Sequence, residues 1–107
     1  MAELTLEKRE SSVQQLAEHA ALAANLLKDL GNVNRLMICC VLVEGELSVG
    51  ELNEKIPLSQ SALSQHLARL RKSGLLAMRK ESQMVHYRLA NKDALKVIAT
   101  LKSIYCP

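Results

Sequence analysis

Aromatic side chains are nearly absent from this sequence of 107 residues. It contains no tryptophan and no phenylalanine, and its two tyrosines are Tyr87 and Tyr105. Proteins that bind single-stranded nucleic acid stack the bases on aromatic side chains, so this scarcity argues against that function. The sequence also lacks internal repeats and low-complexity segments, and its length suits a single domain spanning residues 1–107.

Long hydrophobic runs are lacking too. The longest, from Leu36 to Val43, has eight residues, whereas a helix needs about 20 apolar residues to cross a bilayer. The first ten residues include Glu3, Glu7 and Glu10 and have no apolar segment of the kind found in secretory signals. We therefore expect a cytoplasmic protein that makes no contact with a membrane.

Motifs for enzymatic chemistry and metal binding are also missing. No nucleophile–base pair or cofactor-binding loop can be identified, and the three histidines lack ligand spacing: His19, His66 and His86. The three cysteines contain no C-x-x-C motif, which argues against a thioredoxin-like enzyme: Cys39, Cys40 and Cys106. Because the cytosol keeps thiols reduced, we expect no structural disulfide. Because the motifs for catalysis and cofactor binding are missing, we also expect no cofactor and no enzymatic activity.

The charge is distributed unevenly along the chain. Residues 1–58 hold five Lys/Arg and nine Asp/Glu, whereas residues 59–88 hold six Lys/Arg and only one acidic residue, Glu81. A positive segment of this kind is the electrostatic footprint that phosphate groups require. The same pattern would arise from a solvated basic surface, but the segregation favours nucleic acid.

The segment 59–74 carries the strongest signal in the sequence. Ser59 is a good helix N-cap, and Gly74 is a natural C-terminal stop. Between them Leu63, Leu67 and Leu70 recur at helical spacing and predict one narrow apolar stripe. The opposite face is polar near its N-terminus and cationic near its C-terminus, which suits the major groove of duplex DNA. An ordinary amphipathic surface helix is the alternative.

The sequence before this helix predicts a helix-turn-helix over about residues 48–73. A short helix from Val49 to Ile56 has a capping box formed by Ser48 and Glu51, and Pro57 then forces a tight turn. We expect base contacts from the first part of the second helix and phosphate contacts from its end and from the hairpin that follows. The candidate groove residues are Gln60, Ser61, Ser64, Gln65 and Arg69. The candidate phosphate contacts are Arg71, Lys72, Arg79 and Lys80.

The remaining segments complete a winged helix-turn-helix. Alternating residues over about 75–89 predict a two-stranded hairpin, the wing. Helices are predicted from Ser11 or Ser12 to about Leu30, with frayed residues before it, from Val33 to Glu44, and from Asn91 to Tyr105. The second of these helices is apolar all round from Leu36 to Val43, so we expect it to be buried on every side. The fold class is mainly α (α+β), in the order α-α-α-α-β-β-α.

Three phrases in the sequence resemble the ArsR/SmtB family of winged-helix repressors: LGNVNRLMICCVL, ELSVGELNEKIPLSQSALSQHLARLRKSGLL and HYRL. Within that family, ELSVGEL, SQSALSQHLA and the terminal YCP resemble the HlyU/SqrR/BigR branch, which senses persulfides. The resemblance covers nearly the whole chain. It implies a homodimer formed through the first and last helices, which represses transcription from a double-stranded operator until an effector releases it.

The resemblance also indicates which residues would sense the effector. Positions that carry cysteines in the arsenic and cadmium sensors are Ser48 and Gly50 here, and the last helix has no histidine for a zinc site. Cys40 and Cys106 match the paired sensing cysteines of the persulfide branch. Cys39 is an extra cysteine at a position where an aliphatic residue is usual, so Cys39–Cys106 remains an alternative pairing.

The helical wheel agrees with the pairing of Cys40. This residue continues the face of Val33, Leu36 and Met37, whereas Cys39 points about 100° away. A small reactive sulfur species or another oxidant, such as a peroxide or an electrophile, would bridge the two thiols and release the DNA. Two other functions remain compatible with the sequence, namely a metal-responsive repressor with an unrecognised site and a winged-helix module for protein interaction.

Overall fold

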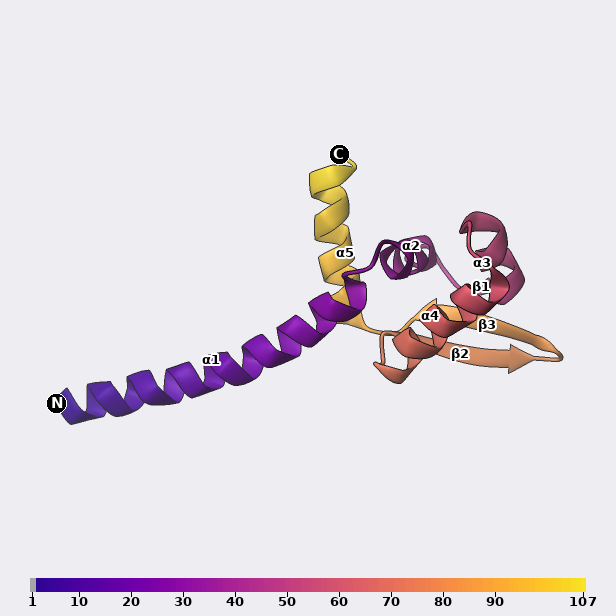
Figure 1. The fold of residues 1–107 in the computed structure, drawn as a ribbon. Coiled ribbons are helices and arrows are strands. Elements are labelled where there is room, and N and C mark those ends of the chain that lie inside the picture. Colours follow the sequence, from indigo (N-terminus) through magenta and orange to yellow (C-terminus); the bar gives the residue numbers. More distant parts are fainter. Residues whose placement is uncertain (1) are drawn as a thin grey trace.

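The chain folds into five helices and a small antiparallel sheet (Figure 1). The computed structural model describes the backbone of residues 2–107 and the side chains of residues 12–107. The helices and strands follow in this order: α1 (Ala2–Leu30), α2 (Val33–Leu42), β1 (Leu47–Ser48), α3 (Val49–Lys55), α4 (Gln60–Lys72), β2 (Leu76–Glu81), β3 (Met84–Leu89) and α5 (Lys92–Tyr105). This arrangement confirms the mainly helical winged helix-turn-helix.

Helix α1 is longer than the sequence pattern predicted. It begins at Ala2 rather than at Ser11 or Ser12 and runs for 29 residues to Leu30. The first ten residues lack an apolar stripe, but most of them are strong helix formers such as Ala, Leu, Glu, Lys and Arg. High intrinsic propensity therefore extends the helix where hydrophobic periodicity gave no signal.

The wing belongs to a sheet of three strands rather than two. Strand β1 pairs with β3, placing Leu47 opposite Tyr87, and the strand order is β1-β3-β2. Strands β2 and β3 are joined by a two-residue turn in which Ser82 has a φ of 58°. Because β1 has only two residues, it produces no alternation that sequence analysis could detect.

The core lies between α2, α3, α4 and the start of α5. Leu63, Leu67 and Leu70 are buried, as their spacing on α4 predicted. They pack in one cluster with residues of the neighbouring elements: Leu30, Ile38, Cys39, Leu42, Leu52, Ile56, Leu75, Leu76, Ala94 and Ile98. The reading helix α4 is therefore anchored along its whole apolar stripe, which leaves the opposite face open.

The expectation that α2 would be buried on every side is wrong for the single chain. Between Leu36 and Val43, Ile38, Cys39 and Leu42 are buried, but Met37 is 37% exposed and the other four residues are only half-buried. Val33, at the start of the helix, is 75% exposed. One apolar face of α2 therefore packs against the core, and another is left uncovered in the single chain. Only residues 31 and 32 separate α2 from the end of α1.

The molecule is elongated. Its principal extents are 64 × 33 × 21 Å and its radius of gyration is 18.1 Å, whereas a compact domain of this length has a radius of about 13 Å. Figure 1 shows the cause, since the first part of α1 projects away from the other elements. None of the helices in the described chain is long and apolar enough to span a membrane.

Candidate nucleic-acid interface and thiol site

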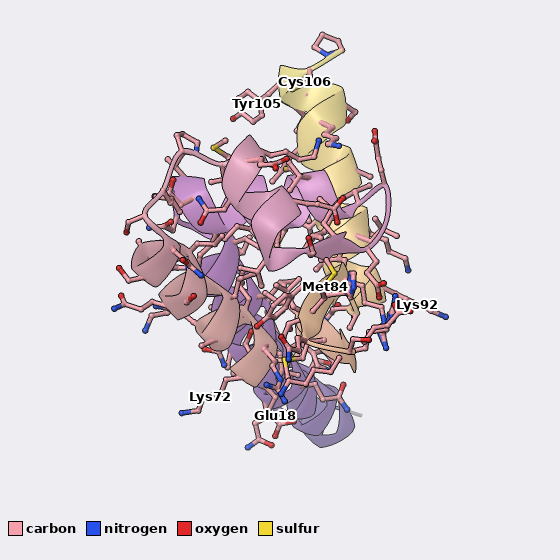
Figure 2. All side chains as sticks on the ribbon, turned by 90° about the vertical axis from the view of Figure 1, so that its right-hand side faces the viewer. Glu18, Lys72, Met84, Lys92, Tyr105 and Cys106 are labelled. Carbon is pink, nitrogen blue, oxygen red and sulfur yellow. The ribbon has the colours of Figure 1, made fainter. Side chains whose placement is uncertain are left out.

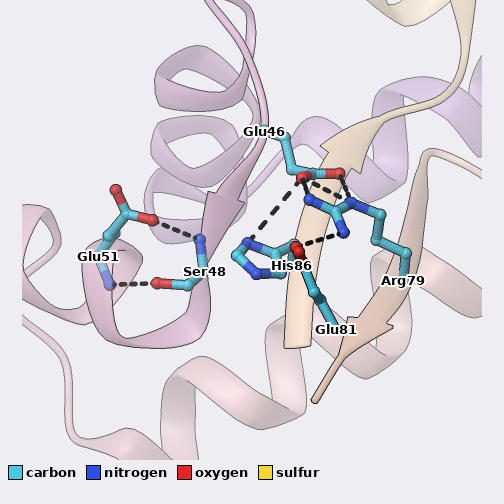
Figure 3. A network of polar contacts seen from close by, with 6 residues as sticks. All are labelled: Glu46, Ser48, Glu51, Arg79, Glu81 and His86. Atoms are coloured by element: carbon cyan, nitrogen blue, oxygen red, sulfur yellow. Dashed lines mark hydrogen bonds and ion pairs between the residues drawn. The ribbon is translucent and has the colours of Figure 1, made fainter. Parts of the chain in front are cut away.

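Local hydrogen bonds fix the orientation of the two helices in the helix-turn-helix. At the start of α3, the Glu51 amide donates to Ser48 Oγ at 3.1 Å and the Ser48 amide donates to Glu51 Oε1 at 3.0 Å, which confirms the capping box (Figure 3). In the turn, Asn53 Nδ2 donates to the carbonyl of Leu58 at 3.0 Å. These bonds set the angle at which α4 leaves the turn.

Helix α4 is closed at both ends as the sequence indicated. Ser59 Oγ accepts a hydrogen bond from the Ala62 amide at 3.2 Å. At the other end, Gly74 has a φ of 86°, and the Leu75 amide donates to the Leu70 carbonyl at 3.0 Å. This is a Schellman motif, which satisfies carbonyl groups that the end of a helix leaves without partners.

The polar half of α4 is open to solvent. Four candidate groove residues are exposed on it: Gln60, Ser61, Ser64 and Gln65. Ser61 Oγ lies 3.3 Å from Ser59 Oγ, and the side chains of the other three make no hydrogen bond within the described part of the chain. Their polar atoms are therefore available to the edges of base pairs.

Arg69, the fifth candidate groove residue, is engaged inside the protein. Its Nε lies 3.3 Å from Asp29 Oδ1, near the end of α1. The Arg69 side chain is 43% exposed and that of Asp29 is 18% exposed. The contact links the reading helix to the long first helix.

Arg35 is a residue that sequence reasoning missed. Its buried guanidinium donates from Nε to the carbonyl of Asp29 at 2.6 Å and from Nη2 to the carbonyl of Lys28 at 3.1 Å. Carbonyls at the end of a helix lack partners and carry partial negative charge, so a cation there is favourable. The signal in the sequence that could have indicated this contact between α1 and α2 is an arginine in the first turn of α2, four residues after Gly31.

Arg79, predicted to contact phosphate, is held by two carboxylates at the wing (Figure 3). Its Nη2 lies 2.6 Å from Glu46 Oε1, and its Nη1 lies 2.8 Å from Glu81 Oε2. The hydrogen bonds from Arg79 lower the pKa of Glu46 and of Glu81, and both carboxylates raise the pKa of Arg79. His86 Nδ1 lies 3.9 Å from the same oxygen of Glu46.

The other three candidate phosphate contacts are exposed and form no ion pair within the described residues: Arg71, Lys72 and Lys80. Arg71 and Lys72 lie in the last turn of α4, and Lys80 lies on β2 near the tip of the wing. The described part of the chain therefore offers unpaired cations at the C-terminal end of α4 and on the wing.

The three cysteines have three different environments. Cys39 is buried in the core, which raises the pKa of its thiol to about 12. Cys40 is half-buried, and burial raises its pKa, while the Lys102 ammonium lowers it and Cys106 raises it. Cys106 is exposed at the free end of α5 (Figure 2). All three are free thiols, and Cys106 is not brought against Cys39 or Cys40.

An open cavity of about 450 Å³ lies beside Cys40. Its lining comes from α2, from the segment between α2 and β1, from the last turn of α3 and from α5: Cys40, Val41, Glu44, Gly45, Glu46, Leu47, Lys55 and Lys102. Lys102 is four residues before Cys106, whose amide donates to the Lys102 carbonyl at 2.8 Å. The cavity thus joins the half-buried thiol to the helix that ends in the exposed one.

The structure does not gather the histidines with other ligands. Within residues 12–107, no group of three or more His, Cys, Asp or Glu side chains is placed to hold a metal ion. His19 is exposed on α1, His66 is half-buried on α4, and His86 faces Glu46 at the wing.

Comparisons with known proteins agree with this architecture. Residues 32–77 match the family described as bacterial regulatory protein, arsR family. The transcriptional activator HlyU of Vibrio cholerae serotype O1 is 47% identical over 95 residues, which cover 89% of this chain and 88% of HlyU. The structure of reduced HlyU from Vibrio cholerae N16961 superposes with a TM-score of 0.84 at 48% identity, over 88% of this chain and 99% of that one. The transcriptional repressor BigR from Xylella fastidiosa superposes with a TM-score of 0.82 at 41% identity, over 88% and 96% of the two chains.

Proposed function

The chain belongs to the ArsR family of bacterial regulatory proteins and is a DNA-binding transcriptional regulator rather than an enzyme, and on this basis we propose that it is a homodimeric, thiol-gated repressor. All 107 residues would form one DNA-binding domain that works in the cytoplasm. A reduced dimer would bind its operator, and bridging of Cys40 and Cys106 by a reactive sulfur species or another oxidant would release it.

The proposed DNA contacts divide into two groups. Gln60, Ser61, Ser64 and Gln65 are exposed on the polar half of α4 and would read base edges in the major groove. Arg71, Lys72 and Lys80 are exposed at the end of α4 and on the wing and would bind phosphates. Arg69 and Arg79 belong to the same proposal, but each must first exchange its carboxylate partner for DNA.

The dimer is supported by apolar side chains that the single chain leaves in solvent. On α1, Val13, Leu16 and Leu27 are each more than half exposed and share one face of the helix. On α5, Ile104 and Tyr105 are exposed as well. Pairing two chains through α1 and α5 would cover these residues and set the two reading helices about 34 Å apart, which is one turn of DNA.

The thiol gate is supported chiefly by Lys102. It lines the cavity of Cys40, and it lies on the same helix as Cys106, one turn earlier. A persulfide would transfer its terminal sulfur to one thiolate and leave as a thiol. The second thiolate would then attack the Sγ atom of the persulfidated cysteine, so that an S–S bond forms between the two Sγ atoms, the bond to the outer sulfur breaks and hydrosulfide leaves. A further round of transfer before closure would insert an extra sulfur.

Bridging must move part of the protein, because the two cysteines do not meet in the reduced structure. The last turn of α5 would have to rearrange towards α2, and each inserted sulfur would shorten that movement by about 2 Å. Since α5 belongs to the proposed interface, its displacement would change the spacing of the reading helices. A cost of only about 1.4 kcal/mol in DNA affinity lowers binding tenfold.

Single cysteine variants test the gate. Cys40→Ser and Cys106→Ser should bind operator normally in reductant and fail to release it when a persulfide is added, as followed by gel shift. Cys39→Ala is the matched control and should release DNA as the unchanged protein does. Normal release by both serine variants would disprove the gate and leave DNA binding with another trigger.

The division of DNA contacts is tested by two alanine variants. Gln65→Ala should weaken binding to the operator by about 1–3 kcal/mol and leave nonspecific binding nearly unchanged. Lys80→Ala should weaken both and reduce the slope of log affinity against log salt by about one for each protomer. Equal losses of specific binding and unchanged salt slopes for the two variants would contradict this assignment.

A further inference from the structure

We propose that the cavity beside Cys40 is a docking site for the sulfur donor, and that it selects a small persulfide carrying two carboxylates and one ammonium group. This inference rests on the proposed thiol gate and adds the residues that choose the donor. Cys40 would be the acceptor thiol, Lys55 and Lys102 would hold the carboxylates, and Glu44 would hold the ammonium group.

The charges around the cavity support this choice. Lys55, Lys102 and Glu44 all line it, and within the described residues none of the three forms an ion pair. Glu46 also lines the cavity, but its carboxylate is already engaged by Arg79. The charges left free are two positive and one negative, which is the complement of a donor with two carboxylates and one ammonium group.

The size and openness of the cavity fit such a donor. Its volume of about 450 Å³ falls in the range of about 300–1,000 Å³ that is usual for small-molecule sites. Glutathione persulfide, a modified tripeptide with two carboxylates and one ammonium group, is the probe of this class. An inorganic polysulfide would also enter the cavity but has no groups for the lysines to hold.

Docking matters at Cys40 because this thiol is sheltered. It is half-buried, and burial raises its pKa, so it meets free oxidants less often than the exposed Cys106 does. A donor held in the cavity places its terminal sulfur beside Cys40. The higher local concentration of the donor then compensates for the limited access to this thiol. The Cys40 thiolate attacks that sulfur, the S–S bond of the donor breaks, the thiolate of glutathione leaves, and Cys40 becomes a persulfide.

The test compares two donors that differ only in charge. Rates of Cys40 persulfidation are measured by mass spectrometry in full-length Cys106→Ser protein, which cannot close the bridge. The donors are glutathione persulfide and its diethyl ester, in which both carboxylates are masked. Their rate ratio is the readout, because Lys102 also lowers the pKa of Cys40 and its removal slows both donors equally.

Lys55→Gln and Lys102→Gln should each lower this ratio about two- to fivefold, as expected for an exposed ion pair. Lys96→Gln is the matched control, since Lys96 lies on α5 outside the cavity, and it should leave the ratio unchanged. If both cavity variants keep the ratio of the parent, the docking site is disproved while the thiol gate stands. If neither donor modifies Cys40 in the Cys106→Ser protein, the docking site is disproved, whereas a gate in which Cys106 receives the sulfur first would stand; failure of the gate itself is read from the operator-release assay with Cys40→Ser and Cys106→Ser.

Discussion

Within residues 12–107, Asp29 is the single residue through which the reading helix contacts α1 by charge. Its backbone carbonyl receives a hydrogen bond from the buried Arg35, and its side chain pairs with Arg69 of α4. The hydrogen bond from Arg35 therefore fixes the position of Asp29, whose side chain pairs with Arg69. In this arrangement Arg69 points to α1 in the absence of DNA, and its charge is partly neutralised before any phosphate approaches.

Asp29→Asn should release Arg69 for phosphate contact. We expect tighter nonspecific DNA binding and a salt slope steeper by about one for each protomer of the proposed dimer, because one more cation per protomer then displaces a counterion. The gain in affinity should be up to about fivefold, since an exposed ion pair is worth at most about 1 kcal/mol. DNA binding measured by fluorescence anisotropy at several salt concentrations gives both quantities.

A second cavity lies between α1, α4 and the start of α5, and its lining includes Asp29, Arg69 and Asp93. The control for Asp29→Asn is Asp93→Asn, which removes an equal charge from this cavity but leaves the ion pair of Arg69 intact. Adding Arg69→Gln to Asp29→Asn should abolish the steeper slope. An unchanged slope in Asp29→Asn itself would show that Arg69 does not exchange partners.

At the residue scale, the sequence predicted which side chains are exposed better than it predicted which residues form ion pairs. The candidate groove residues Gln60, Ser61, Ser64 and Gln65 are exposed as their helical positions required. The helical wheel placed Cys39 and Cys40 on different faces without ranking their burial, and in the structure Cys39 is buried and Cys40 is half-buried. Asp29, the partner of Arg69, and Glu46, one of the two partners of Arg79, however, lie 40 and 33 residues away in the sequence. Such ion pairs depend on tertiary packing, so no local pattern could reveal them.

At the scale of elements, helix ends followed from the sequence because their chemistry is local. The capping box of α3 and the glycine stop of α4 involve residues no more than five positions apart. Strand β1 was missed because it is only two residues long and exists through its pairing with β3. The start of α1 was missed because a helix without an apolar stripe gives no periodic signal.

Gly74→Ala tests the stop of α4. Gly74 has a φ of 86°, and an added Cβ would meet no atom within 4 Å, so the cost is backbone strain alone. A left-handed conformation costs a non-glycine residue about 1–2 kcal/mol, and we expect the free energy of unfolding to fall by that amount in urea titrations. Gly50→Ala is the control within helix α3, where the added Cβ has room and should stabilise the protein slightly.

No change in the free energy of unfolding on Gly74→Ala would mean that the left-handed conformation of residue 74 is not what ends α4. Because α4 carries the proposed groove contacts, the same variant should also weaken operator binding more than Gly50→Ala does. The comparison requires equal protein concentrations, since the stability of a dimer depends on them.

At the scale of the whole molecule, the elongated shape points to a missing neighbour. A helix of 29 residues is about 43 Å long, and only its C-terminal part contacts the rest of the chain (Figure 1). The exposed face of α2 has the same explanation, which is why its all-round apolar character led to an overestimate of its burial. A single chain has more apolar surface than it can cover, and the proposed homodimer would cover it.

Leu16→Glu should separate the proposed dimer. Leu16 is 66% exposed on α1, so the change leaves the protomer core intact, but it would place two carboxylates in a symmetric interface. Burying one leucine side chain is worth about 1.5–3 kcal/mol. Because the interface contains the residue twice, the dissociation constant should rise more than a hundredfold.

Gln15→Glu adds the same charge on another face of α1 and should stay dimeric. Sedimentation velocity should therefore give the 11.8 kDa monomer for Leu16→Glu alone, together with weak operator binding, because one reading helix spans only half of the site. A Leu16→Glu protein that sediments and binds operator like the Gln15→Glu control would show that this face of α1 is not the interface.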